Sequence, residues 1–278
     1  MIVFLNGQFV PEEQATVSVF DRSFLYGDGL FEALRVTNGK PFRWWQHMER
    51  MRKGGDFLGI KIPFACKSLE KFAADLIAKN QMPEALLRLT VSRGVGLRGY
   101  SPRGATKPML VMTLHALPEA PGSGTGWKLH TASVRLPAGE KLAQFKTANK
   151  LAQVLARSEA DVAAADEALL LNTDGFVVEG ASSNLFWVEE GTICTPPLAS
   201  GILAGVTRAV TLELCQELAL PFAEREITPE GLRGAAGAFV TLSSFGVVEC
   251  RALDGVSLAR SSVVEKLRRA YDELLLRE

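Results

Sequence analysis

Two lysines stand four residues apart in the stretch QFKTANKLAQ, residues 144–153, where an apolar helical pattern begins. The pattern predicts a helix that is capped by Thr147 and packs through an apolar stripe: Leu151, Val154, Leu155 and Val162. The positive end of a helix dipole disfavours an exposed ammonium group by about 0.3–1 kcal/mol. Lys146 and Lys150 are therefore either solvated lysines on a surface turn, or they include one lysine that loses its proton and acts as a nucleophile.

A second candidate site is the stretch SGILAGVTRAVTLELCQEL, residues 200–218, in which a glycine-rich turn leads into a predicted helix. Gly205, Val206 and Thr207 occupy the first turn, where free amide groups, a hydroxyl and the helix dipole can bind a phosphate group. An ordinary helix start has the same pattern, so this signal is weak on its own.

The third candidate is Glu179, which stands among apolar and small residues in GFVVEGASSNLFWVEEG, residues 175–191. A glutamate on a turn that faces water is the commoner case, but a carboxylate in such surroundings needs a cation or a shared proton. An N-protonated heterocycle would serve. Lys146, the phosphate-type turn and Glu179 together match what pyridoxal 5′-phosphate requires, namely an amine, an anion cradle and a counter-charge.

The stretch GVGLRG, residues 94–99, matches a dinucleotide-binding motif, but the following YSPRGATKP does not begin a helix. We therefore predict a wide loop there. Its side chains Arg93, Arg98 and Tyr100 are suited to binding a carboxylate, although an exposed basic loop explains them equally well.

The composition excludes several classes of function. The 278 residues include 31 basic and 31 acidic side chains with no basic run, which argues against nucleic-acid binding. Neither a signal peptide nor a run of eighteen apolar residues is present, so we expect a soluble cytoplasmic protein without a membrane partner. The four cysteines are scattered and the three histidines lie in no nucleophile motif, which favours neither a metal site nor Ser/His hydrolysis.

The hydrophobic pattern predicts an α+β protein with a small-molecule site in the cleft between two domains. The stretch LPEAPGSGTG predicts a linker over 117–126, between an N-terminal α/β domain over 1–116 and a cofactor-binding domain over 127–278. The predicted strands are 2–5, 30–36, 86–92, 108–115, 127–134, 167–172, 184–189 and 238–242. The predicted helices are 44–58, 68–79, the one after Thr147, 206–218 and 262–277.

Seven segments, in this order, resemble the fold-type IV pyridoxal-phosphate enzymes, or class IV aminotransferases. This family includes branched-chain aminotransferases, D-amino-acid aminotransferases, R-selective amine transaminases and 4-amino-4-deoxychorismate lyases. The resemblance covers nearly the whole chain. The segments are DRSFLYGDGLFEALRV (21–36), HMERM (47–51), SRGVGLRGYSP (92–102), FKTANKLAQVLAR (145–157), ADEALLLNTDGFVVEGASSNLFW (165–187), GILAGVTR (201–208) and FVTLSSFGV (239–247).

The resemblance implies the two-domain fold of D-amino-acid aminotransferases, with pyridoxal 5′-phosphate between the domains. It also implies a homodimer whose partner subunit helps to close the active site. Lys146 would form the Schiff base and carry the substrate proton, and Glu179 would hold the pyridine nitrogen. The other cofactor contacts map onto Arg50, Leu203, Gly205, Val206, Thr207, Ser243 and Ser244. The substrate contacts map onto Phe31, Ala33, Arg98, Tyr100 and Phe245.

Departures within the family bear on the reaction. The stretches RGYSP, FKTANKL and NLFW resemble the lyases, but Ala33 stands where lyases have a threonine whose hydroxyl is associated with β-elimination. We therefore expect an aminotransferase that acts on α-amino acids and 2-oxo acids, with Lys150 as a bystander. The alternative is 4-amino-4-deoxychorismate lyase, and a non-catalytic cofactor-binding protein is a remote third. The sequence leaves the substrate and its chirality open.

Overall fold

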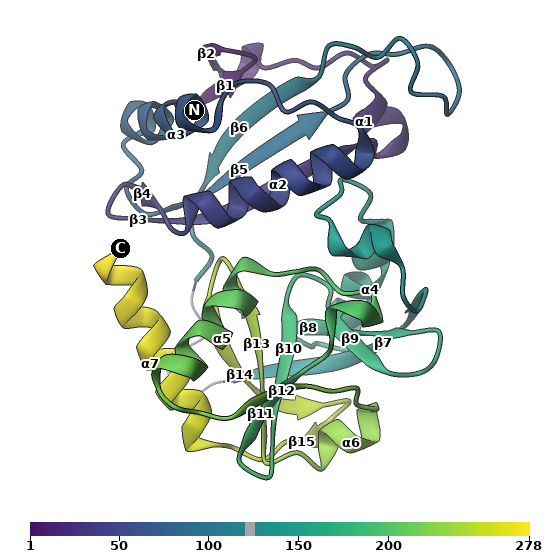
Figure 1. Cartoon of the computed structure of the whole chain (residues 1–278), viewed down its shortest axis with the longest axis vertical. Helices are drawn as coiled ribbons and strands as arrows, with labels where there is room; N and C mark the ends of the chain where they lie inside the picture. Colours follow the sequence, from purple (N-terminus) through teal and green to yellow (C-terminus); the bar gives the residue numbers. More distant parts are fainter. Residues whose placement is uncertain (120–125) are drawn as a thin grey trace. The chain divides into compact units, whose positions relative to one another are not determined.

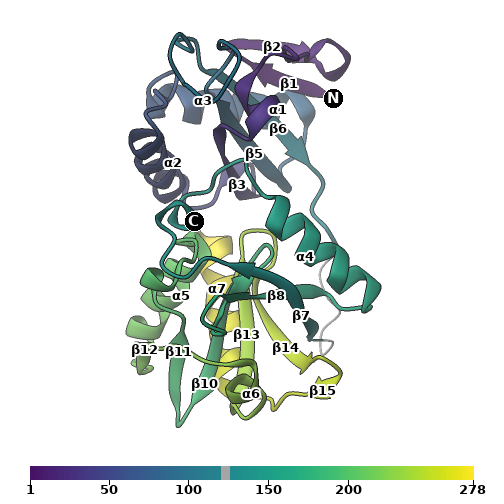
Figure 2. The same cartoon turned by 90° about the vertical axis from the view of Figure 1, so that its right-hand side faces the viewer.

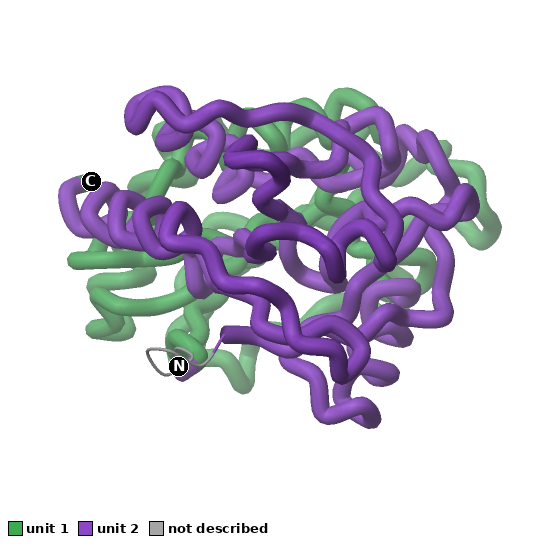
Figure 3. The backbone as a smooth tube through the Cα atoms, turned by 90° about the horizontal axis from the view of Figure 1, so that it is seen from below, with its two compact units in different colours: residues 1–118, 145–150, 278 green, residues 119–144, 151–277 purple. Residues whose placement is uncertain are grey.

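A computed structural model of the chain describes residues 1–119 and 126–278. The chain divides into two compact units (Figure 3). Unit 1 comprises residues 1–118, 145–150 and 278, and unit 2 comprises residues 119–144 and 151–277. Residues 120–125 of the linker predicted over 117–126 lie outside the described residues. Among the described residues, no helix combines the length and the apolar composition that crossing a membrane demands.

Unit 1 is built on a six-stranded antiparallel sheet in the order β2-β1-β6-β5-β3-β4 (Figure 1). Its strands are β1 (Ile2–Leu5), β2 (Gln8–Pro11), β3 (Gly29–Thr37), β4 (Lys40–Pro41), β5 (Ala85–Ser92) and β6 (Met109–His115). Helices α2 (Trp44–Leu58) and α3 (Cys66–Asn80) pack against one face of the sheet, where Leu34 and Leu87 are fully buried. A short helix α1 (Arg22–Tyr26) precedes β3.

Alternation along β3 and β5 determines which side chains reach the other face of this sheet. Leu34 and Leu87 point toward the helices, so Phe31, Ala33 and Arg88 lie on the opposite face, where each is half-buried. Gly54 brings α2 close to β3, because a Cβ at this position would lie 2.9 Å from the Leu30 side chain. One sheet face thus holds the core and the other carries predicted substrate contacts.

Unit 2 contains a nine-stranded mixed sheet in the order β12-β11-β10-β13-β14-β7-β8-β9, with β15 on β14. Because β9 also pairs with β10, six of the strands close into a ring. The strands are β7 (Trp127–Leu136), β8 (Glu167–Asn172), β9 (Val177–Gly180), β10 (Asn184–Glu189), β11 (Thr192–Thr195), β12 (Phe222–Glu224), β13 (Gly237–Leu242), β14 (Gly246–Leu253) and β15 (Val256–Ser257).

The α-helices that the structure describes in this unit are α4 (Leu151–Val162), α5 (Val206–Glu217), α6 (Pro229–Arg233) and α7 (Ser262–Arg277). Helix α4 packs on β7 and β8 (Figure 2), and α5 lies beside α7 (Figure 1). A fully apolar core lies between the strands and includes Leu185, Trp187 and Val240. The cysteines of the described residues are free thiols; three of them are buried and Cys66 is half-buried.

The structure corrects two predictions about α4. The helix begins at Leu151, so Thr147 is not its N-cap; instead Thr147 forms a β-bridge with Leu30 in unit 1. The apolar stripe is exposed, with Val154 60% and Val162 88% accessible to solvent. The helix packs through small side chains, Ala156 and Ala160, which allow a close approach to the strands. Spacing alone could not show which of the two apolar faces is buried.

Candidate active site

Lys146 lies in a segment, residues 145–150, that belongs to unit 1 and runs along the start of β3. The amide of Phe31 donates a hydrogen bond of 2.9 Å to the carbonyl oxygen of Lys146. The ring of Phe145 stacks on Phe57 of α2, with 4.4 Å between centroids. The segment that carries Lys146 is therefore fixed to both a strand and a helix, which limits the positions that its side chain can reach.

Two basic side chains lie against the ring of Phe31. The Nζ of Lys146 is 4.6 Å and the Cζ of Arg88 is 3.9 Å from the ring centroid, which places both within cation–π range. Arg88 pairs in register with Ala33. Burial lowers the pKa of Arg88, but a guanidinium group remains charged at neutral pH. Arg88 was not predicted as a site residue, although it is the only basic residue in the apolar strand ALLRLTVS.

A buried carboxylate holds Arg50, which the sequence predicts as a phosphate ligand. Glu32 is 0% exposed and accepts hydrogen bonds from the Nε (2.8 Å) and Nη2 (2.5 Å) of Arg50. The Nδ1 of His47 lies 2.7 Å from the same carboxylate. The fork of two parallel bonds fixes the plane of the Arg50 guanidinium group.

The charges of this cluster follow from its burial. Burial opposes ionisation of Glu32, but the charge and hydrogen bonds of Arg50, with the His47 bond, lower the pKa of Glu32 to about 2. Burial also disfavours the charged form of His47; it therefore lowers the pKa of His47, and this effect outweighs the opposing effect of Glu32. At neutral pH the cluster is thus an anion, a cation and a neutral imidazole that donates through Nδ1. Glu32 and His47 were not predicted as site residues, although Glu32 occupies a core position of β3 and His47 lies one helical turn before Arg50.

The loop that follows β5 carries two predicted substrate contacts, Arg98 and Tyr100. As the sequence predicts, no helix follows Gly99. Both side chains are exposed, and Tyr100 is 87% accessible. The ring of Tyr100 packs edge-on against Tyr26 of α1, with 5.5 Å between centroids.

In unit 2, the buried carboxylate of Glu179 lies where β9 meets β10. Glu179 is 8% exposed and pairs in register with Asn184. Its Oε2 accepts a hydrogen bond of 2.9 Å from the amide of Leu203, and the side-chain amide of Asn184 donates to the carbonyl of Leu203, also at 2.9 Å. Both polar groups of the Leu203 backbone are thus held by the two strands.

The helix α5 begins directly after this contact. Its N-cap is Gly205, whose missing side chain leaves the first-turn amides without a capping acceptor from that residue. A Cβ at Gly205 would lie 1.9 Å from the Oδ1 of Asn184, so only glycine fits without displacing that side chain. Val206 and Thr207 are buried in the first turn, and the predicted helix start is confirmed.

A second carboxylate in unit 2 supports the turn after Glu179. Glu167 of β8 is 1% exposed and accepts hydrogen bonds from the amide of Ser182 (3.2 Å) and the hydroxyls of Ser182 (2.7 Å) and Ser183 (3.0 Å). The amide of Gly180 donates to the carbonyl of Ser183 at 2.7 Å. The small residues beside Glu179 therefore make a turn that is tied to the neighbouring strand.

The remaining predicted residues lie in the turn between β13 and β14. Ser243, Ser244 and Phe245 are half-buried, and the Phe245 ring packs edge-on against Trp127, 5.4 Å between centroids. Thr241, which no motif singled out, pairs in register with Asn184. Its Oγ1 is buried and has no hydrogen-bond partner among the described residues.

Each unit thus gathers its own set of functional groups. Unit 1 brings Lys146, Phe31 and Arg88 together, and it fixes Arg50 through Glu32. Unit 2 brings Glu179 together with the turn at 203–205 and the start of α5. These assignments of site residues remain predictions.

Residues 29–253 match the family model described as amino-transferase class IV. The chain belongs to the class IV aminotransferase family. A putative branched-chain-amino-acid aminotransferase of Methanocaldococcus jannaschii is 36% identical over 99% of this chain and 96% of that protein. A D-alanine aminotransferase of Staphylococcus epidermidis is 30% identical over 94% of this chain and 92% of that protein.

Solved structures of this family share the fold. The branched-chain aminotransferase of Thermoproteus uzoniensis with norvaline has a TM-score of 0.93 at 29% identity, covering 100% of this chain and 95% of that chain. The 4-amino-4-deoxychorismate lyase of Pseudomonas aeruginosa has a TM-score of 0.88 at 34% identity, covering 99% of both chains. A third structure is a branched-chain aminotransferase complexed with N-(5′-phosphopyridoxyl)-L-glutamate, with a TM-score of 0.92 at 28% identity, covering 99% and 94%. The predicted family, fold and aminotransferase class are confirmed.

Proposed function

We propose that the protein transfers an amino group between an α-amino acid and a 2-oxo acid with pyridoxal 5′-phosphate bound at Lys146. One observation of this structure carries the assignment of the cofactor. A buried carboxylate, Glu179, and the uncapped start of α5 are linked through residues 203–205. A protonated ring nitrogen would pair with the Glu179 carboxylate, and a phosphate group would accept from the first-turn amides of α5. Pyridoxal 5′-phosphate carries both of these groups. The buried hydroxyl of Thr241 adds a polar group beside the same strands.

In this proposal Lys146 holds the cofactor aldehyde, Glu179 the ring nitrogen, and Leu203 packs on the ring. The phosphate group is bound by the first-turn amides of α5 with Arg50 and the two serines of the β13–β14 turn. When bound, the cofactor supplies an electron sink that makes the substrate Cα–H acidic. The Lys146 amine would carry that proton between the substrate Cα and C4′ of the cofactor. Glu32 and His47 keep the Arg50 guanidinium oriented throughout.

We propose further that one of the two substrates is an acidic amino acid with its 2-oxo acid. Arg88 supports this because its half-buried guanidinium group lies over Phe31, on the same sheet face as Ala33, and offers a fork for a carboxylate. The glutamate adduct in the third solved structure is consistent with such a substrate. An Arg88→Lys variant tests it: we expect KM for glutamate or 2-oxoglutarate to rise more than tenfold while KM for an apolar substrate changes little.

The lyase alternative is favoured by one observation, the 34% identity with the Pseudomonas aeruginosa lyase over 99% of both chains. The two reactions are distinguished by their products. A single amino acid added without an oxo acid converts the cofactor of an aminotransferase to pyridoxamine 5′-phosphate. A lyase instead releases pyruvate and 4-aminobenzoate from 4-amino-4-deoxychorismate and leaves the cofactor unchanged.

We also propose that the protein is a homodimer. Large apolar side chains are exposed on α1 and the loop after β5, including Phe24 (69%) and Leu97 (74%), and on the outer face of α4, including Val162 (88%). Such exposed apolar groups mark association surfaces, and a two-fold axis pairs each with an identical or a complementary patch. Light scattering coupled to gel filtration should give twice the mass of the chain. A Val154→Glu variant should shift this toward one chain.

The decisive experiment combines attachment and turnover. We expect borohydride reduction of the purified holoenzyme to add a phosphopyridoxyl group to the peptide that contains Lys146, and a panel of both enantiomers of common amino acids to identify the donor. Lys146→Ala should abolish turnover, whereas Lys150→Ala should retain it. A label on another lysine, or full turnover by Lys146→Ala, would refute the proposal.

A further inference from the structure

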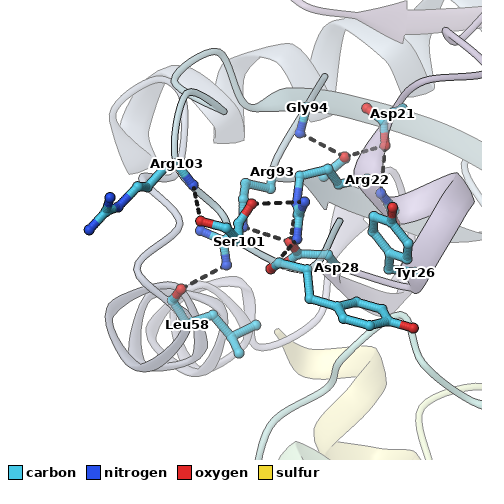
Figure 4. Close-up of polar contacts among 12 residues, drawn as sticks. Asp21, Arg22, Tyr26, Asp28, Leu58, Arg93, Gly94, Ser101 and Arg103 are labelled. Carbon is cyan, nitrogen blue, oxygen red and sulfur yellow. Dashed lines mark hydrogen bonds and ion pairs between the residues drawn. The ribbon is translucent and has the colours of Figure 1, made fainter. Parts of the chain in front are cut away.

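Two arginines that are distant in sequence converge on one carboxylate in unit 1 (Figure 4). The Oδ2 of Asp28 accepts a 2.7 Å hydrogen bond from the Nε of Arg22 and another of 2.7 Å from the Nε of Arg93. The side chains of Arg22, Arg93 and Asp28 are 4%, 11% and 15% exposed. A carboxylate that is shared by two guanidinium groups at such low exposure fixes the positions of both.

The outer nitrogens of Arg22 hold the loop after β5 by its main chain. Nη1 donates to the carbonyls of Gly99 (2.9 Å) and Ser101 (3.2 Å), and Nη2 donates to that of Tyr100 (3.0 Å). The amide of Gly99 in turn donates to the hydroxyl of Tyr26 at 3.3 Å. The loop is therefore folded around a single buried guanidinium group.

The outer nitrogens of Arg93 reach a different element. They donate to the carbonyls of Leu58 (2.8 Å) and Gly59 (3.1 Å), at the C-terminal end of α2. A cation is stabilised there by the free carbonyls of the last turn. Through Asp28, the end of the helix that carries Arg50 is thus joined to the loop that carries Arg98.

The residues next to Asp28 hold the Lys146 segment. The carbonyl of Gly29 accepts a 2.9 Å hydrogen bond from the amide of Ala148, and Leu30 forms a bridge with Thr147. Gly27 also lies against this segment, because a Cβ there would be 3.1 Å from the Cα of Asn149. One short stretch, residues 27–31, therefore sets the separation between the predicted catalytic lysine and the loop at 99–101.

Besides Arg22, the described residues support the loop through Tyr26, whose hydroxyl accepts from Gly99 and whose ring packs against Tyr100. Leu97, Arg98 and Tyr100 are exposed, so apolar burial does not fix their backbone. Among the described residues, Arg22 donates to all three main-chain carbonyls of 99–101. The side chains that the loop presents to a substrate consequently depend on the orientation of one arginine, and this orientation depends on Asp28.

We propose that Asp28 and Arg22 are positioning residues that hold the loop at 99–101 in the conformation that binds the substrate carboxylate. The inference rests on the proposed aminotransferase function. Neither residue touches the cofactor contacts assigned above, so their loss should weaken substrate binding without releasing the cofactor.

The test uses Arg22→Lys and Asp28→Asn in the holoenzyme. Arg22→Lys keeps the charge next to Asp28 but cannot donate to Asp28 and to three carbonyls at once. Arg103→Ala is the matched control, because Arg103 lies on the same loop and only its amide is in the network, where it donates to the Ser101 hydroxyl. Three quantities are measured: amide hydrogen exchange of peptides covering 96–101, KM and kcat for the amino donor, and the visible absorbance of the cofactor.

We expect faster exchange over 96–101 and a ten- to hundredfold rise in KM, with kcat changed less than threefold and the cofactor absorbance unchanged. Arg103→Ala should match the wild type in all three. Faster exchange with an unchanged KM would overturn the proposal, and so would unchanged exchange. If Asp28→Asn does not fold, the exchange and KM of Arg22→Lys alone test the proposal. If the wild type has no transaminase activity, the proposed function fails, and the exchange data still decide whether Arg22 holds the loop.

Discussion

The two units hold their functional groups by different means. In unit 1, charged side chains fix other charged side chains: Glu32 holds Arg50, and Asp28 holds Arg22 and Arg93. In unit 2, strands and glycine turns fix the main chain: Glu179 and Asn184 hold the backbone of Leu203, and Gly205 opens the start of α5. The first arrangement is sensitive to charge and the second to volume. Substitutions that change only one of these properties should therefore affect one unit more than the other.

The largest expected effect comes from neutralising the buried carboxylate of unit 1. Glu32→Gln keeps the shape of the side chain but removes the buried negative charge that pairs with Arg50, which is 10% exposed. Removing one partner of a buried pair costs about 3–5 kcal/mol of unfolding free energy. Urea unfolding at pH 7 measures it. The control is Glu49→Gln on α2, the helix that carries Arg50; Glu49 is an exposed partner of Arg52, and its loss should change stability little.

The matching change in unit 2 adds volume and no charge. Gly205→Ala has a permitted backbone conformation, φ −65°, but its Cβ would meet the Asn184 side chain, whose amide is already bonded to Leu203. We expect a loss of about 1–3 kcal/mol, the usual cost of overpacking, together with lower cofactor content after purification. Gly234→Ala is the control, because the nearest atom to its Cβ would be 3.5 Å away. If Gly205→Ala and Gly234→Ala lose the same stability, the contact with Asn184 does not make Gly205 sensitive to added volume. The proposed contrast with the charge-sensitive unit 1 would then not hold.

The same difference explains what could be read from the sequence. The groups of unit 2 come from short continuous stretches, since Glu179 with its small neighbours, and Gly205 with the helix it precedes, are local patterns. The links of unit 1 join distant positions: Glu32 contacts α2, and Arg22 contacts carbonyls 77 to 79 residues away. The periodicity of a local sequence segment does not reveal contacts between such distant residues. Among them only the placement of Glu32 at a core position of β3 was a usable signal.

The success of the secondary-structure predictions likewise depended on how local the sequence pattern is. Long periodic segments such as Trp44–Leu58 and Ser262–Arg277 have the predicted bounds. Short strands such as β11 and β12 were missed, because three or four residues do not define a period. The exposed stripe of α4 shows a second limit, since an apolar face that is exposed looks the same in sequence as one that packs against the core.

A third change asks whether side-chain charge matters at all in unit 2. Glu167→Gln removes one acceptor from a buried site where Ser182 and Ser183 donate to Glu167, so about 1–3 kcal/mol of unfolding free energy should be lost. Glu159→Gln is a close control: Glu159 accepts from the amide and hydroxyl of Ser133 but is exposed. If the two variants unfold alike, burial is not what makes the Glu167 turn stable.

The smallest effect is a pH dependence that belongs to unit 1. Burial lowers the pKa of His47 below its ordinary value of 6.5, so below that pH the unfolded chain binds a proton that the folded chain does not. Stability should therefore fall as the pH drops from about 7 toward 5, by at most about 1.4 kcal/mol per pH unit for one proton.

His47→Asn isolates this effect, because asparagine can still donate to Glu32 but does not titrate. Its stability should be nearly flat between pH 7 and 5, and His115→Asn, at the exposed end of β6, controls for the loss of an imidazole. Glu32 contributes in a lower window: its pKa is lowered to about 2, so its stabilisation is present above its unfolded value and is lost as the pH falls toward 2. If the unfolding free energy of His47→Asn falls between pH 7 and 5 as steeply as that of the wild type, the proton is bound by another group. The buried cluster of Glu32, His47 and Arg50 would then not be the cause of the acid sensitivity.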